Sequence, residues 1–79
     1  SPRTMEREME DRELSACIDA WLRTLKQEDR VLFLRRYWYG MPLQDLAKEQ
    51  HMSSGKLAQR MFRLRTNLRQ ALEKEGIIL

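Results

Sequence analysis

Hydrophobic residues recur at helical spacing through most of the 79-residue chain. Residues 1–12 are polar and charged, and Met5 and Met9 are their only large apolar side chains. The first regular stripe follows, with members three or four residues apart and therefore on one helix face. It comprises Leu14, Cys17, Ile18, Trp21, Leu22 and Leu25. We therefore expect residues 1–12 to be a flexible or partly helical linker, and residues 13–79 to form the domain.

Two shorter helical patterns come after a polar break at residues 26–29. The first of them is expected to run through about Tyr39, because Gly40 suits a helix end and Pro42 suits the first turn of the next helix. Its apolar side is predicted to consist of Val31, Leu34 and Trp38, flanked by Phe33 and Tyr37. A short third helix over residues 43–50 is expected to turn Leu43, Leu46 and Ala47 inward.

The last pattern is a long amphipathic helix from about Ser54 to Lys74. Ser53 is a good N-cap, and Gly76 is a suitable helix stop. The apolar stripe of this helix is Leu57, Met61, Leu64, Leu68, Ala71 and Leu72. The sequence therefore predicts an all-α fold, a compact four-helix domain with a C-terminal helix-turn-helix and a long recognition helix.

Charge is distributed unevenly along the chain. The formal net charge is +3, but residues 53–72 contain five basic side chains and no acidic one. Such a basic segment on a balanced domain predicts a polyanionic partner. The chain opens Ser-Pro-Arg-Thr-Met rather than with an initiator Met, so we expect it to be a piece of a longer protein.

The remaining composition argues against several classes of site. One cysteine and one histidine leave no internal disulfide and no cluster of metal ligands. No apolar run approaches the roughly 18–20 residues that span a bilayer. No nucleophile–base pair or glycine-rich phosphate loop is recognisable. We expect a cytoplasmic protein with no catalytic activity, no cofactor, no bound metal and no membrane partner.

The last helix carries side chains suited to reading DNA. In a helix-turn-helix the second helix packs one face on its own domain and presents the opposite, N-terminal face to the major groove. Lys56, Gln59 and Arg63 project away from the apolar stripe, and Arg60 lies at its edge. Arg and Gln can bond guanine and adenine edges, and basic side chains can neutralise phosphates. A small residue such as Gly55 allows close approach of phosphate to the helix N-terminus. The predicted DNA-binding residues are Ser53, Ser54, Lys56, Gln59, Arg60 and Arg63.

The order of these residues resembles region 4 of bacterial RNA polymerase sigma factors, and most closely the extracytoplasmic-function type. The resemblance is carried by Asp45-Leu46-Ala47, Met52-Ser53, the run from Gly55 to Arg65, Leu68-Arg69, and the upstream stretch from Leu25 to Tyr37 with Gly40. It covers about residues 14–76. One departure is His51, which stands where the family usually has glycine and must then adopt a left-handed turn conformation.

The resemblance implies a role in transcription initiation. Such a domain recognises the −35 promoter element through the positions that match here, Ser53, Lys56, Gln59, Arg60 and Arg63. It also docks on the β flap of RNA polymerase and is a target of anti-sigma factors. The expected partners are therefore double-stranded promoter DNA, the RNA polymerase core and an anti-sigma factor.

The aromatic residues raise a second possibility, a protein-binding surface. Trp21 and Trp38 lie on apolar stripes and are predicted to be core residues. Phe62 lies off its stripe and is predicted to pack under a neighbouring helix, with contact to a thymine methyl group as the alternative. Tyr37 or Tyr39 is expected to belong to a protein-binding patch.

Two functional alternatives remain at this point. One is an interaction module whose main partner is RNA polymerase or an anti-sigma factor. The other is the helix-turn-helix effector domain of a response regulator.

Overall fold

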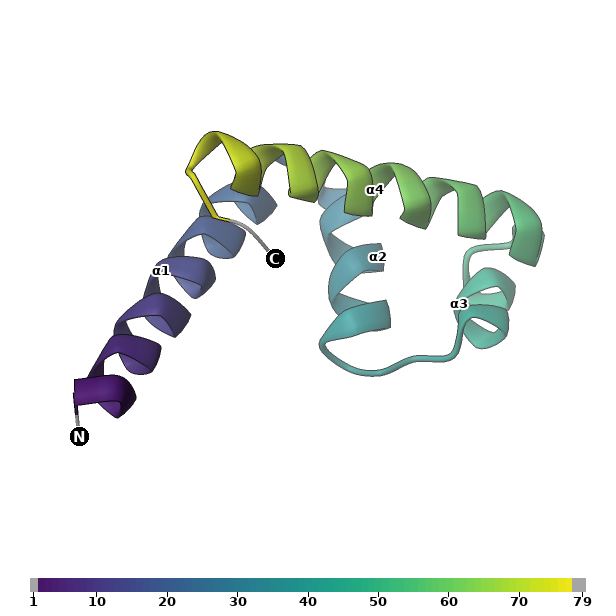
Figure 1. Ribbon diagram of the computed structural model, residues 1–79. Coiled ribbons are helices and arrows are strands. Elements are labelled where there is room, and N and C mark those ends of the chain that lie inside the picture. The colour runs from purple at the N-terminus through teal and green to yellow at the C-terminus, as the bar shows by residue number, and fades with distance from the viewer. Residues whose placement is uncertain (1, 78–79) are drawn as a thin grey trace.

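The computed structural model describes the backbone of residues 2–77 and the side chains of residues 4–77. Within that range it has four helices and no strand, as predicted for an all-α domain (Figure 1). The helices are α1 (Pro2–Thr24), α2 (Gln27–Tyr37), α3 (Leu43–Glu49) and α4 (Ser54–Lys74). Ser1 of the predicted linker (residues 1–12) and residues 78–79 of the predicted domain (residues 13–79) lie outside the described residues. None of the described helices is both long and apolar enough to cross a membrane.

Helix α4 packs against each of the other three helices. Figure 1 shows its C-terminal half beside α1, its middle over α2 and its N-terminal end beside α3. The predicted stripe of α4 faces this core, because Leu57, Met61, Leu64 and Leu72 are buried and Leu68 packs against the core. Burial of these side chains removes apolar surface from water at about 25 cal/mol per Å². The helix that carries the predicted DNA-binding residues therefore also holds the domain together.

Trp21 joins three helices at the centre of the domain. The side chain is buried, as predicted, and its ring meets Phe33 of α2 edge to face with 4.9 Å between ring centroids. Its indole Nε1 donates a hydrogen bond of 2.6 Å to Oδ1 of Asn67 on α4. The bond satisfies a polar group that would otherwise be buried without a partner.

The prediction that Trp38 is a core residue is wrong. Helix α2 ends at Tyr37 rather than Tyr39, and Trp38 is 79% exposed. The core residue of α2 is Leu32, which is 1% exposed. On a helical wheel Trp38 lies about 120° from Leu32 and so points away from the core. Beyond Trp38 the chain turns through Gly40, whose φ of 69° is readily adopted by glycine.

Helix α1 begins at Pro2, so residues 2–13 are helical rather than irregular. Figure 1 shows this N-terminal half projecting away from the other helices. Met5 and Met9 are exposed on it. A linker role for this segment stays a prediction.

The turn between α3 and α4 fixes the start of α4. His51 has φ 55°, the left-handed conformation that its position predicts. Its backbone N–H donates to the carbonyl of Lys48 at 3.2 Å, and that of Met52 donates to the carbonyl of Ala47 at 3.0 Å. This pair of bonds is a Schellman motif and satisfies the last carbonyls of α3. Helix α3 itself ends at Glu49, one residue before the predicted end.

Candidate nucleic-acid interface

The N-terminus of α4 is capped, exposed and free of acidic side chains in its first turn. Ser53 Oγ accepts a 3.2 Å hydrogen bond from the backbone N–H of Lys56, which confirms the predicted N-cap. Ser53, Ser54, Gly55 and Lys56 are all exposed. A Cβ placed on Gly55 would meet no heavy atom of the domain within 4 Å, so packing inside the domain does not require glycine there. Exposed backbone N–H groups at a helix start form a favourable position for a phosphate.

The structure brings most of the predicted DNA-binding side chains together beside one hollow. This hollow, of about 600 Å³, lies between α4 and the junction of α1 with α2, and Lys56, Gln59, Arg60 and Arg63 line it. Ser53 lines a second hollow, of about 630 Å³, together with Lys56 and Arg60. We call the surface formed by Ser53, Ser54, Lys56, Gln59, Arg60 and Arg63 the reading face.

The charge around the first hollow is mainly basic. Four basic and two acidic side chains line it, namely Lys26, Lys56, Arg60, Arg63, Glu28 and Asp29. The acidic pair comes from the first turn of α2, where carboxylates favour the positive end of the helix dipole. A polyanion that approached the reading face would therefore meet a positive surface with two carboxylates at its edge.

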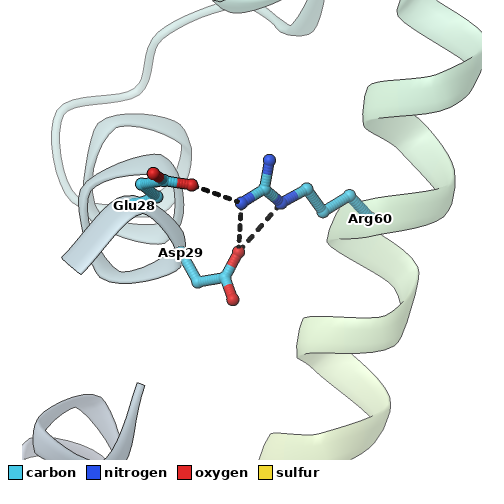
Figure 2. A network of polar contacts seen from close by, with 3 residues as sticks. All are labelled: Glu28, Asp29 and Arg60. Atoms are coloured by element: carbon cyan, nitrogen blue, oxygen red, sulfur yellow. Dashed lines mark hydrogen bonds and ion pairs between the residues drawn. The ribbon is translucent and has the colours of Figure 1, made fainter. Parts of the chain in front are cut away.

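Arg60 is the member of the reading face that contacts this acidic pair (Figure 2). Its Nε donates to Oδ1 of Asp29 at 2.8 Å, and its Nη2 lies 2.7 Å from the same oxygen. A longer ion pair of 3.7 Å joins Nη2 to Oε2 of Glu28. Sequence periodicity placed Arg60 at the edge of the apolar face but gave no sign of these partners.

The flanking side chains of α4 differ from the reading face. Arg65 donates from Nη1 to the hydroxyl of Tyr37 at 2.7 Å. Arg69 is exposed. The prediction that Phe62 packs under a neighbouring helix is wrong, because this side chain is 62% exposed. On the helical wheel it lies about 140° from Leu57 and so on the outer side of α4.

A second surface feature, which we call the aromatic groove, lies on the opposite flank of α4. It is a hollow of about 660 Å³ between α1, α2 and α4. The residues that line it are Ser15, Ile18, Asp19, Leu22, Phe33, Leu34, Tyr37, Trp38, Tyr39, Arg65 and Leu68. Tyr37 and Tyr39 are exposed, as their predicted place in a protein-binding patch requires, and Trp38 joins them. Exposed apolar area of this kind marks interaction sites on soluble domains.

Comparisons with known proteins bear on the resemblance seen in the sequence. A search of curated proteins and a search of solved structures return no match to the chain. A scan against family models matches residues 15–68 to the family described as Sigma-70, region 4. The matched residues include the core of α1, all of α2 and α3, and the reading face on α4. Because the match spans more than half of the chain, the protein belongs to the sigma-70 region 4 family.

Proposed function

We propose that the chain recognises the −35 element of bacterial promoters as the C-terminal domain of a sigma factor of the extracytoplasmic-function type. Sigma-70 region 4 is a DNA-binding regulatory domain that recognises promoter DNA in sigma factors generally. The finer assignment is supported by the run from Gly55 to Arg65, which resembles the recognition helix of that type. A domain with this role works in the bacterial cytoplasm, where the polymerase and the promoters are.

The observation that carries the proposal is the exposed reading face at the start of α4. Lys56, Gln59 and Arg63 are exposed side by side, while Leu57, Met61 and Leu64 on the other side of the helix are buried. A helix can enter a major groove only if one side is anchored in the domain and the other is unobstructed. Ser53, Ser54 and Gly55 supply the phosphate-binding helix start, and Gln59 and Arg63 supply side chains for base edges.

Selection of DNA from a random pool tests this role without assuming a promoter sequence. The 79-residue chain is incubated with duplexes of randomised sequence, with and without RNA polymerase core, and the retained DNA is sequenced. We expect one short motif to be enriched, and affinity for it to fall steeply with salt because Lys and Arg displace counterions from phosphates. No enrichment in either condition would overturn the proposal.

A Lys56→Ala/Gln59→Ala double variant locates the recognition on the reading face. We expect it to lose preference for the selected motif while it keeps its helical content, because both side chains are exposed. The matched control replaces Arg69, an exposed basic residue farther along α4, with Ala. Equal loss of preference in the control would place recognition outside the reading face.

We further propose that the aromatic groove docks on the β flap of RNA polymerase. Region 4 domains interact with the polymerase in general, and this groove combines exposed aromatic side chains with an apolar floor. Interfaces are enriched in such side chains at their centres. The anti-sigma factor expected from the resemblance would compete for this groove or for the reading face.

The two surfaces can be separated by paired variants. A Trp38→Ala/Tyr39→Ala variant should weaken binding to purified core polymerase and leave selection of the DNA motif unchanged. The Lys56→Ala/Gln59→Ala variant should lose selection of the DNA motif and bind core polymerase as the wild type does. If the aromatic variant binds polymerase normally, docking occurs elsewhere on the domain.

A further inference from the structure

The two carboxylates beside Arg60 are not equivalent. Asp29 accepts from both Nε and Nη2 of the guanidinium at 2.8 and 2.7 Å, and its side chain is only 23% exposed. Glu28 reaches the guanidinium at 3.7 Å, and its side chain is 85% exposed. Short, partly shielded contacts to a charged donor are the stronger ones, whereas long exposed ion pairs contribute little. Asp29 therefore determines how Arg60 is held.

The contact with Asp29 uses the guanidinium edge formed by Nε and Nη2 and leaves Nη1 available. Among the described residues, Nη1 of Arg60 has no hydrogen bond or ion pair, and Figure 2 shows it pointing away from both carboxylates. The guanidinium is a rigid plane, so fixing Nε and Nη2 also fixes the direction of Nη1. A lysine in this place would offer a point charge without a second, oriented edge.

Arg60 shares its surroundings with other members of the reading face. It lines the first hollow with Lys56, Gln59 and Arg63, and it lines the second with Ser53 and Lys56. Its partner Asp29 is 31 residues away in the chain, in the first turn of α2. The contact thus connects the start of α2 to the part of α4 that faces the hollow.

We propose that Asp29 is a positioning residue for DNA recognition, which holds Arg60 so that Nη1 faces the duplex. This inference rests on the proposed function. Asp29 touches no DNA in this scheme and acts only through Arg60. Its carboxylate is also neutralised by Arg60, so that the contact limits repulsion between Asp29 and phosphate.

Removing the carboxylates of Asp29 and Glu28 one at a time distinguishes positioning of Arg60 from a general electrostatic effect on DNA affinity. Loss of a negative charge near DNA raises the affinity for every duplex alike, because phosphate attraction carries no sequence information. Loss of a positioning contact lowers the preference for the selected motif over a scrambled one. Asp29→Asn and Glu28→Gln remove the same charge from neighbouring positions, so Glu28→Gln is the matched control.

The test measures the ratio of affinities for the selected duplex and a scrambled duplex, using the full chain by fluorescence anisotropy. We expect Asp29→Asn to lower this ratio by about five-fold or more, which is the low end of the cost of one mismatched base pair. Glu28→Gln should leave the ratio unchanged and tighten binding to both duplexes by the same factor. Circular dichroism at the assay temperature establishes that each variant is folded.

If Asp29→Asn fails to fold, Arg60→Lys provides a second variant. It keeps a positive charge near Asp29. We expect it to lower the ratio as Asp29→Asn does, because lysine has no second edge to direct. If the ratio stays at the wild-type value in Arg60→Lys, or in a folded Asp29→Asn chain, the positioning role is overturned while the proposed function stands. If the wild-type chain prefers no duplex, the proposed function fails and this inference fails with it.

Discussion

Gly55→Ala should have opposite effects on folding and on DNA binding. Gly55 is the second residue of α4 and is exposed, and its backbone is not in the left-handed region. A Cβ there would lie in open space, with no heavy atom within 4 Å. Alanine at such a position loses less backbone entropy on folding, which stabilises by about 0.5–1 kcal/mol. For a domain of this size we expect the melting midpoint to rise by roughly 2–8 °C.

The same methyl group should weaken binding to DNA. A backbone N–H must come within about 2.9 Å of a phosphate oxygen to donate a hydrogen bond. A side chain at the second helical residue takes up space that the phosphate would occupy. A hydrogen bond to a charged group contributes about 1.5–3 kcal/mol, and partial loss of one corresponds to about 1 kcal/mol, or five-fold in affinity. The loss should be equal for selected and scrambled duplexes, since phosphate contacts carry no base information.

Thermal unfolding by circular dichroism and fluorescence anisotropy with labelled duplexes measure the two effects on one preparation. Gln70→Ala is the control, because Gln70 is exposed on the C-terminal half of α4 and the substitution also favours helix. It should raise stability slightly and leave DNA affinity unchanged. If Gly55→Ala binds DNA as tightly as the wild type does, no phosphate approaches the start of α4 closely, and the reasoning is refuted.

Three further predictions concern the turn, the core and the aromatic groove. His51→Gly should raise stability by about 0.5–1 kcal/mol in thermal melts, because glycine adopts the left-handed conformation without strain; Gln50→Gly, where φ is −87°, should give no gain. Asn67→Ala should lower stability by about 1–2 kcal/mol, because it leaves Nε1 of Trp21 buried without an acceptor. Asn67→Asp keeps an acceptor oxygen and should therefore retain most of the stability that Asn67→Ala loses. If Asn67→Asp is destabilised as much as Asn67→Ala, loss of the hydrogen bond is not the cause. In fluorescence quenching by acrylamide, Trp38 should be accessible and Trp21 protected, and core polymerase should shield Trp38 if it covers the aromatic groove; equal quenching of the two would contradict their burial.

Helical periodicity was sufficient to predict most of the fold. In α4 the apolar positions are separated by polar ones, so only one face can be buried, and Leu57, Met61, Leu64 and Leu72 are buried there. Local signals also determined the ends of elements. The side chain of Ser53 caps α4, as its residue type predicts.

Helix α2 shows where periodicity fails. Residues 31–34 are all apolar, so several faces of the helix satisfy the pattern and packing against α3 and α4 decides between them. Leu32 is buried as a result, while Trp38 follows the end of the helix and is exposed. A run of adjacent apolar residues determines that a helix is buried, but not which side.

The exposure of Lys56, Gln59 and Arg63 was predictable for the same reason as the burial of the α4 stripe, since the three side chains lie on the side opposite to it. Their role in DNA binding stays a prediction. The partner of Arg60 was not predictable. Asp29 is distant in the sequence, and an acidic residue in a first helical turn is already explained by the helix dipole. A contact between two such residues depends on how the helices are placed, which only the packed structure determines.

Because α4 contacts every other helix, its two sides are under different constraints during evolution. Changes at Leu57 or Met61 alter the packing of the whole domain and should be removed by selection for folding. Changes at Lys56, Gln59 or Arg63 alter exposed side chains and should be nearly neutral for folding. Under the proposed function, single substitutions at these three positions can therefore change promoter preference without a prior gain in stability. A library randomised at these positions should consist largely of folded domains, and under the same proposal these domains should differ in specificity.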